Sequence, residues 1–132
     1  MPLAVVSTLP PETELVIQRT IGCAIEVHRT LGPGYLESIY AQAMEIELQA
    51  AHLAFERERP IVVQYKHHRL AGQRVDFIVE GQLIVEIKAV ARLDPLFQAK
   101  LISYLRTTGL RAGLLMNFNS LLLKDGLNRI VV

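Results

Sequence analysis

Apolar residues recur every three or four positions in two stretches near the start of the chain, a spacing typical of amphipathic helices. In residues 11–31 the inward positions are Ile17, Ile21, Ala24, Ile25 and Leu31. In residues 35–52 they are Leu36, Ile39, Tyr40, Ala43 and Met44. The sequence Gly32-Pro33-Gly34 lies between the two stretches, and such residues end a helix. The pattern therefore predicts an N-terminal helical hairpin.

The hydrophobic period changes at about Phe55. From there to Val90 the chain consists of runs rich in Val and Ile, with candidate turns near Lys66-His67, Ala71-Gly72 and Gly81. Short β-branched runs separated by turn residues are typical of strands. This part of the chain should form an antiparallel meander of three or four strands.

Residues 94–109 form a third predicted helix, in which Asp94 suits the N-cap, Pro95 the first turn and Gly109 the end. Another buried strand is expected at residues 112–118. A strand, a helix and a second strand make a crossover unit, so the strands at 83–90 and 112–118 should be parallel. The tail should add a turn and a short edge strand. Together these elements predict an α/β (α+β) fold with a mixed sheet.

Composition limits the class of protein. The chain has 132 residues, of which 51% are hydrophobic, and its formal net charge is +1. This predicts a single domain over residues 1–132, with residues 1–10 flexible. No apolar run is long enough to span a membrane, and the start lacks the features of a signal peptide. The single cysteine, Cys23, favours a reducing setting, so we expect a soluble, cytoplasmic protein without membrane contact.

The predicted strand at Leu83–Val90, LIVEIKAV, carries two charges, Glu86 and Lys88. A hairpin centred on Gly81 would place Val79 opposite Leu83 and Asp76 opposite Glu86. Residues that face each other in a ladder have β-carbons about 5 Å apart on one face of the sheet. The two carboxylates should therefore lie side by side.

The two faces of this hairpin differ in polarity. The face of the carboxylates would also carry Arg74, Ile78, Ile84 and Lys88. The opposite face would be apolar, with Val75, Phe77, Val79, Leu83, Val85 and Ile87. This difference predicts helices packed against the apolar face and an open cleft above the mixed face, lined by the charges.

Two neighbouring carboxylates repel each other when both are ionised, and a divalent cation between them removes the conflict. Mg²⁺ or Mn²⁺ fits oxygen ligands from two or three side chains, because either ion also accepts waters and a substrate phosphate. Lys88 would lie about 6.6 Å along the strand from Glu86 on the same face. It could contact an attacking water or the negative charge that develops on phosphorus.

The series Asp76, hairpin turn, Glu86, Lys88 resembles the PD-(D/E)XK nuclease superfamily, although Val75 replaces the proline of the motif. The segment VHRTLGPGYLESIYAQAMEIEL is similar to the GxxExxY proteins of that superfamily, with Gly34, Glu37 and Tyr40 at the naming positions. The likeness extends over nearly the whole chain from about Ile21.

This resemblance implies a restriction-endonuclease-like core, a mixed central sheet flanked by helices, in a nuclease that cleaves nucleic acid, DNA by analogy. It also implies metal ligation by Glu37, Asp76, Glu86 and the backbone carbonyl of Ile87. Related sequences carry Gln four residues before the tyrosine of the third helix, whereas this chain has Lys100 before Tyr104. Gln98 points elsewhere on a helix. Lys100, Tyr104 and Tyr40 would then support the substrate side of the site.

Several of these residues also have simple structural interpretations. Glu37 could be an acid that favours the first turn of a helix, and Tyr40 and Tyr104 could be core aromatics. Asp76, Glu86 and Lys88 could form a cross-strand ion network. His28 is expected either in the core or as a bridge between the two helices of the hairpin, and Cys23 has no base nearby in sequence to activate it as a nucleophile.

Three functions remain open from the sequence. The first is a metal-dependent nuclease. The second is a non-catalytic module on a nuclease scaffold, which binds nucleic acid or regulates another protein. The third is an enzyme for a nucleotide or other small phosphoester. The near-zero net charge requires any nucleic-acid contact to be local. His67 and His68, with the basic residues around them, form either such a phosphate-binding rim or a solvated sheet edge. A homodimer would enlarge the binding surface.

Overall fold

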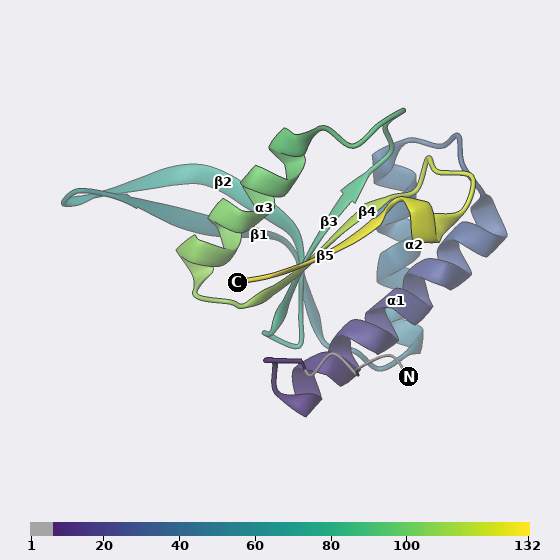
Figure 1. Cartoon of the computed structure of the whole chain (residues 1–132), viewed down its shortest axis with the longest axis horizontal. Helices are drawn as coiled ribbons and strands as arrows, with labels where there is room; N and C mark the ends of the chain where they lie inside the picture. The colour runs from purple at the N-terminus through teal and green to yellow at the C-terminus, as the bar shows by residue number, and fades with distance from the viewer. Residues whose placement is uncertain (1–6) are drawn as a thin grey trace, which may run out of the picture.

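The computed structural model describes residues 7–132 of the chain and contains three α-helices around a five-stranded sheet (Figure 1). The elements are α1 (Pro11–Leu31), α2 (Glu37–Ala50), β1 (Phe55–Tyr65), β2 (His68–Val79), β3 (Leu83–Lys88), α3 (Pro95–Thr108), β4 (Ala112–Asn117), the 3-10 turn η1 (Leu123–Asp125) and β5 (Leu127–Val131). The predicted α+β fold class is confirmed, with helix and strand in the expected order. No helix within residues 7–132 has the length and apolar character needed to cross a membrane.

The sheet has the strand order β1-β2-β3-β4-β5. The pair β3–β4 is parallel and the other pairs are antiparallel, so the predicted crossover, mixed sheet and edge strand are confirmed. The meander contains three strands, because β2 continues through the candidate turn at Ala71-Gly72. The strand pairing is irregular at this point. The register of β1 shifts between Ile61 and Val63, and Gly72 of β2 has a positive φ of 111°.

The α1–α2 hairpin covers one face of the sheet, as predicted. Its core includes Ile17, Ala24, Tyr40 and Met44, packed with Phe77, Val79, Leu83, Val85 and Ile87 of the sheet. Three predicted inward positions are wrong: Ile25 is 51% exposed, Leu36 73% and Ile39 38%. Each four-residue step turns a helix position by about 40°, so Ile25 has rotated away from the side of Ile17. Leu36 precedes α2 as its N-cap residue.

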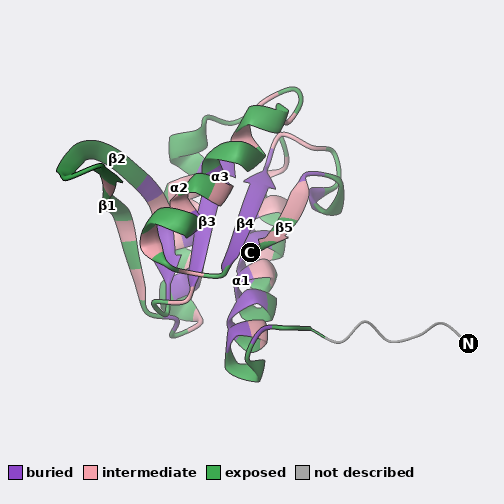
Figure 2. Cartoon of the chain, turned by 60° about the vertical axis from the view of Figure 1, so that its left-hand side comes forward, coloured by how far each residue is buried: buried purple, intermediate pink, exposed green. Residues whose placement is uncertain are grey.

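The other face of the sheet is covered by α3, which corrects the prediction of an open cleft there. Leu101 and Leu105 of α3 pack with Ile78, Ile84 and Leu115 in a second core. Val75 also belongs to this core rather than to the apolar face for which it was predicted. Opposite Asp76, Glu58 of β1 has a φ of +52°. This distortion lies where successive side chains of β2 no longer alternate between the two faces of the sheet. Figure 2 colours β3 and β4 as buried along nearly their whole length.

The position of α3 is fixed by its ends and by one close contact. The Asp94 carboxylate accepts a hydrogen bond from the Leu96 N–H at 2.8 Å, and Gly109 ends the helix with a φ of 75°. Both predicted helix signals are confirmed. Gly113 of β4 allows the helix to approach closely, because a β-carbon there would lie 2.9 Å from a methyl carbon of Leu101.

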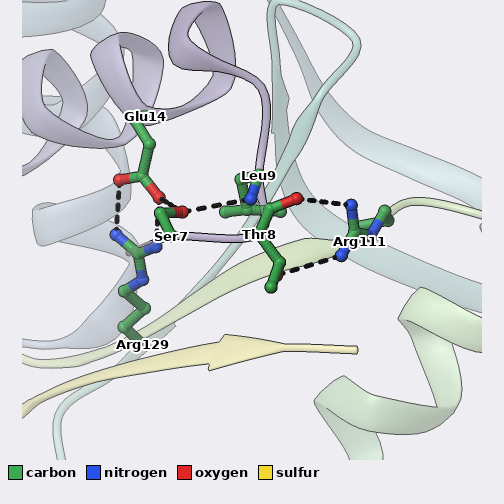
Figure 3. A network of polar contacts seen from close by, with 6 residues as sticks. All are labelled: Ser7, Thr8, Leu9, Glu14, Arg111 and Arg129. Atoms are coloured by element: carbon green, nitrogen blue, oxygen red, sulfur yellow. Dashed lines mark hydrogen bonds and ion pairs between the residues drawn. The ribbon is translucent and has the colours of Figure 1, made fainter. Parts of the chain in front are cut away.

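The first described residues are bonded to the body of the protein (Figure 3). Ser7 and Arg129 both donate to the Glu14 carboxylate, and these two bonds, with Arg129 the stronger influence, lower the pKa of Glu14 to about 2. Arg111 donates to Thr8 at 3.0 and 3.2 Å. Of the segment predicted to be flexible, residues 1–6 lie outside the described residues, whereas Ser7 and Thr8 are held by these side-chain bonds.

Candidate active site

The β2–β3 hairpin brings Asp76 and Glu86 together at the point where its ladder ends. Val79 pairs with Leu83 and Phe77 with Val85, which confirms the predicted register. Beyond Phe77 the side chains replace main-chain partners across the strands. The Asp76 N–H donates to Glu86 Oε1 at 3.1 Å, and the Ile87 N–H donates to Asp76 Oδ2 at 2.7 Å. Each carboxylate is therefore held by the backbone of the strand that carries the other.

These bonds leave one oxygen of each carboxylate available. Within residues 7–132 no hydrogen-bond donor meets Asp76 Oδ1 or Glu86 Oε2. Glu86 is only 8% exposed, whereas Asp76 is half-buried. Neither oxygen is among the fully buried atoms without a partner in residues 7–132, so a proton or a cation can reach both of them.

The electrostatics of Glu86 reflect this crowding. Burial first, and then the negative charge of Asp76, raise the pKa of Glu86 to about 8, against the opposing effects of the Asp76 N–H and the Lys88 ammonium. At neutral pH the Glu86 carboxyl therefore holds a proton unless a positive charge replaces it. Oxygen ligands of this kind suit Mg²⁺ or Mn²⁺, so the chemistry of the pair fits a divalent cation.

Lys88 lies next to the pair and beneath α3. The residue is half-buried, and its Nζ atom is 4.7 Å from the centre of the Phe97 ring, a distance at which a cation is attracted to an aromatic face. A cavity of about 50 Å³ separates this part of β3 from α3. It is lined by Glu86, Lys88, Phe97, Lys100, Tyr104 and Leu115.

The cavity is large enough for an ion or a few waters but too small for a nucleotide. Tyr104 and Lys100, one turn apart on α3, form part of its wall. The pKa of the Tyr104 hydroxyl is raised, first by burial and then by the charges of Glu86 and Asp76. Lys100 is exposed at the rim. The structure thus brings four predicted residues, Glu86, Lys88, Lys100 and Tyr104, to one cavity, with Asp76 bonded to the first.

Glu37 is not brought into a shared site with the pair. It is exposed in the first turn of α2. Within residues 7–132, no three or more His, Cys, Asp or Glu side chains lie close enough together to hold one ion. The predicted set of three carboxylates is therefore not assembled, because Asp76 and Glu86 interlock on the hairpin while Glu37 points to solvent.

Tyr40 has a structural position. Its hydroxyl donates to the Gly32 carbonyl at 2.6 Å and accepts from the Tyr35 N–H at 3.2 Å. Its ring stacks on Phe118, with centroids 4.8 Å apart. Tyr40 therefore fixes the turn between α1 and α2 and does not line the cavity. His28 contacts the same region, with Nε2 2.7 Å from the Ser120 carbonyl oxygen.

Two residues that position the site, Phe97 and Asn117, were not predicted from the sequence. Phe97 provides the ring beneath the Lys88 ammonium. Asn117, 4% exposed, accepts from the Val90 N–H at 3.1 Å and donates to the Val90 carbonyl at 2.9 Å. It thereby fixes the chain directly after Lys88. Asn117 could have been found in the sequence, because it is a polar residue in a predicted buried strand, as Glu86 is.

The remaining sequence candidates lie away from the cavity. His67 and His68 are exposed at the β1–β2 turn. Cys23 is buried, and its thiol lies 3.5 Å from the Glu47 carbonyl oxygen. Burial raises the pKa of that thiol, which disfavours the thiolate that a nucleophile needs.

A family model described as PD-(D/E)XK nuclease superfamily matches residues 14–130. This range includes all of the cavity residues and both carboxylates of the hairpin. The match is to the superfamily and does not distinguish the GxxExxY group. Curated proteins and solved structures give no match.

Proposed function

Because this chain belongs to the PD-(D/E)XK nuclease superfamily, we propose that it is a metal-dependent phosphodiesterase that cleaves DNA. The observation that supports the proposal most strongly is the interlocked pair of Asp76 and Glu86, together with the cavity that Glu86 and Lys88 line. A purely structural ion network would gain more from a pairing in which each carboxylate meets a cation, because the like charges oppose folding.

Asp76 and Glu86 would hold Mg²⁺ or Mn²⁺ through the oxygens that lack a donor. Such an ion would supply positive charge for the phosphate and lower the pKa of a water molecule. The resemblance assigns two more ligands, the Ile87 carbonyl and the Glu37 carboxylate. Ile87 is already adjacent to the pair, through the bond from its N–H to Asp76. Glu37 would complete the set only through a different position of the first turn of α2.

Lys88 would act on the phosphate and on the attacking water. Its ammonium can donate hydrogen bonds to a phosphate oxygen and stabilise the negative charge that increases as water attacks phosphorus. The partly buried position above Phe97 limits competing solvent. Tyr104 and Lys100 on α3 would contact the substrate from the opposite side of the cavity, with Lys100 in the place of the usual Gln.

The residues Gly34, Glu37 and Tyr40 support a place for the chain in the GxxExxY branch of the superfamily. Tyr40 serves there as a structural residue, because its hydroxyl bonds to the turn that contains Gly34. The free thiol of Cys23 supports a reducing, cytoplasmic setting.

The proposal is tested by cleavage of a labelled DNA duplex with Mg²⁺ or Mn²⁺. Glu86→Gln and Lys88→Ala should abolish cleavage and leave the circular dichroism spectrum unchanged. Lys124→Ala, an exposed lysine of η1, is the matched control and should cleave normally. Cleavage by purified Lys88→Ala at the wild-type rate would refute the assignment of this site.

A non-catalytic module is the second candidate. Two observations favour it: Lys100 in place of the usual Gln, and a described chain in which no third acid joins the pair. Calorimetric titration with Mn²⁺ separates the two functions. Heat from one binding event that disappears in Glu86→Gln supports the nuclease, whereas no heat, together with inert DNA, supports the module.

A further inference from the structure

The β1–β2 hairpin extends beyond the body of the protein as a two-stranded arm, which comprises residues 59–74 (Figure 1). Ile61 is buried at its base beside α3, and every residue from Gln64 to Arg74 is exposed. Figure 2 colours the far end of β1 and β2 as exposed. Ordered backbone that buries little of its surface contributes little to stability, so the arm needs another explanation.

The charge of the arm differs from that of the remaining chain. The arm contains Arg59, Lys66, Arg69 and Arg74, and none of the thirteen acidic residues of the chain. His67 and His68 lie at its tip. Elsewhere ten basic residues are outnumbered by the thirteen acids, so the net charge of +1 conceals a local basic surface. This surface is the local field that nucleic-acid binding requires.

The cations at the tip are free to contact a ligand. Arg59 pairs with Glu56, and Arg74 lies 3.7 Å from Glu58. Lys66 and Arg69 pair with no acid within residues 7–132. Lys66 instead lies over the Tyr65 ring, 5.5 Å from its centre. Two unpaired cations at the end of an exposed hairpin are suited to phosphate groups.

The arm leads directly to the candidate active site. Arg74 at its base is two residues from Asp76 in the same strand. At about 3.3 Å per residue, the seven residue steps from Arg69 to Asp76 span about 23 Å along the strand. The same length of B-form DNA contains about seven base pairs, at about 3.4 Å per base pair. A duplex that follows the arm would therefore reach the carboxylates with one of its phosphates.

The shape of the arm selects the type of nucleic acid. A two-stranded ribbon fits the major groove of B-form DNA, which is about 12 Å wide. The deep, narrow major groove of A-form RNA does not admit it. Addition of a peptide strand to the outer edge of β1 is disfavoured, because Pro60 lacks an N–H and the register shifts after Ile61.

We propose that the arm lies in the major groove of duplex DNA and holds the duplex against the Asp76–Glu86 pair. The inference rests on the proposed function and adds the part of the chain that binds the substrate. Lys66 and Arg69 contact phosphates at the tip of the arm. The arm, rather than the small cavity, provides most of the binding surface.

The test is the affinity for a duplex of about 20 base pairs, measured by fluorescence anisotropy in EDTA so that nothing is cut. The variant Lys66→Ala/Arg69→Ala removes two charges from the tip. The control Arg29→Ala/Lys124→Ala removes two exposed charges from α1 and η1. Loss of two phosphate contacts should reduce the slope of log affinity against log salt by about 2 and weaken binding about tenfold or more. The control should remain within about twofold of the wild type.

Each other outcome overturns the proposal. If the wild type cleaves DNA and the arm variant binds like the control, the arm is not the binding surface, although the proposed function stands. If the wild type neither binds nor cleaves DNA, both fail. Equal affinity for an RNA duplex of the same sequence would exclude the major-groove position. Unchanged DNA binding with a changed oligomeric state would identify the arm as a contact between copies.

Discussion

The raised pKa of Glu86 predicts an unusual dependence of stability on pH. In the metal-free protein the folded-state pKa is about 8, compared with an ordinary value of 4.5. Between these values the folded state binds a proton that the unfolded state has released, so the free energy of unfolding falls as pH rises. The protonated form stabilises the fold fully below about pH 4.5, and this contribution is lost as pH rises through 8.

The magnitude follows from the size of the shift. Each pKa unit corresponds to about 1.4 kcal/mol, so a shift of this size amounts to several kcal/mol. That is a large fraction of the stability of a typical domain. Glu86→Gln keeps an oxygen that can accept from the Asp76 N–H and removes the ionisable group. The variant should therefore gain stability relative to the wild type as pH rises, by several kcal/mol near pH 9.

The assay is urea unfolding in EDTA at intervals from about pH 5 to about pH 9. Groups common to both proteins cancel in the difference between wild type and Glu86→Gln. Glu12→Gln, which removes an acid from an exposed position on α1, controls for the change in net charge. Added Mn²⁺ should stabilise the wild type at pH 8 but not Glu86→Gln. A difference between the two proteins that is constant across the pH range would refute the proposed electrostatics of the pair.

Three further predictions concern other parts of the chain. Gly113→Ala should lower the free energy of unfolding in urea by about 1 to 3 kcal/mol, because the added β-carbon meets Leu101. A second substitution, Leu101→Ala, should remove this clash. If the losses of the two substitutions are simply additive, the clash is not the cause. Glu14→Gln should lower the melting temperature at pH 5 but not at pH 2. The pKa of Glu14 is lowered to about 2, so the stability that its carboxylate contributes is lost as pH falls through that value. An equal decrease in melting temperature at both pH values would contradict this. Glu37→Gln should weaken Mn²⁺ binding in calorimetry if Glu37 is the third carboxylate, and affinity equal to that of the neighbouring control Ser38→Ala would remove it from the ligand set.

The sequence predicted those features that depend on local chemistry. Turn residues at Gly81 set the register of the β2–β3 hairpin, and with it the meeting of Asp76 and Glu86. The caps of α3, Asp94 and Gly109, were readable because their requirements concern single backbone positions. The parallel pairing of β3 and β4 followed from the right-handed crossover rule, which constrains topology strongly.

Features that depend on tertiary packing were less accessible. The position of α3 over the mixed face requires Leu101 and Leu105 to meet Ile84, which no local pattern specifies. The two hydrogen bonds between the Asn117 side chain and the Val90 backbone join residues 27 positions apart. The exposure of Glu37 depends on the orientation of α2 relative to the sheet, so a family motif alone did not determine it.

The most direct test of the central claim is anomalous diffraction from crystals soaked with Mn²⁺. We predict one strong peak in contact with carboxylate oxygens of both Asp76 and Glu86, absent from crystals of Asp76→Asn soaked in the same way. A wild-type crystal with no manganese peak at these carboxylates would contradict the claim.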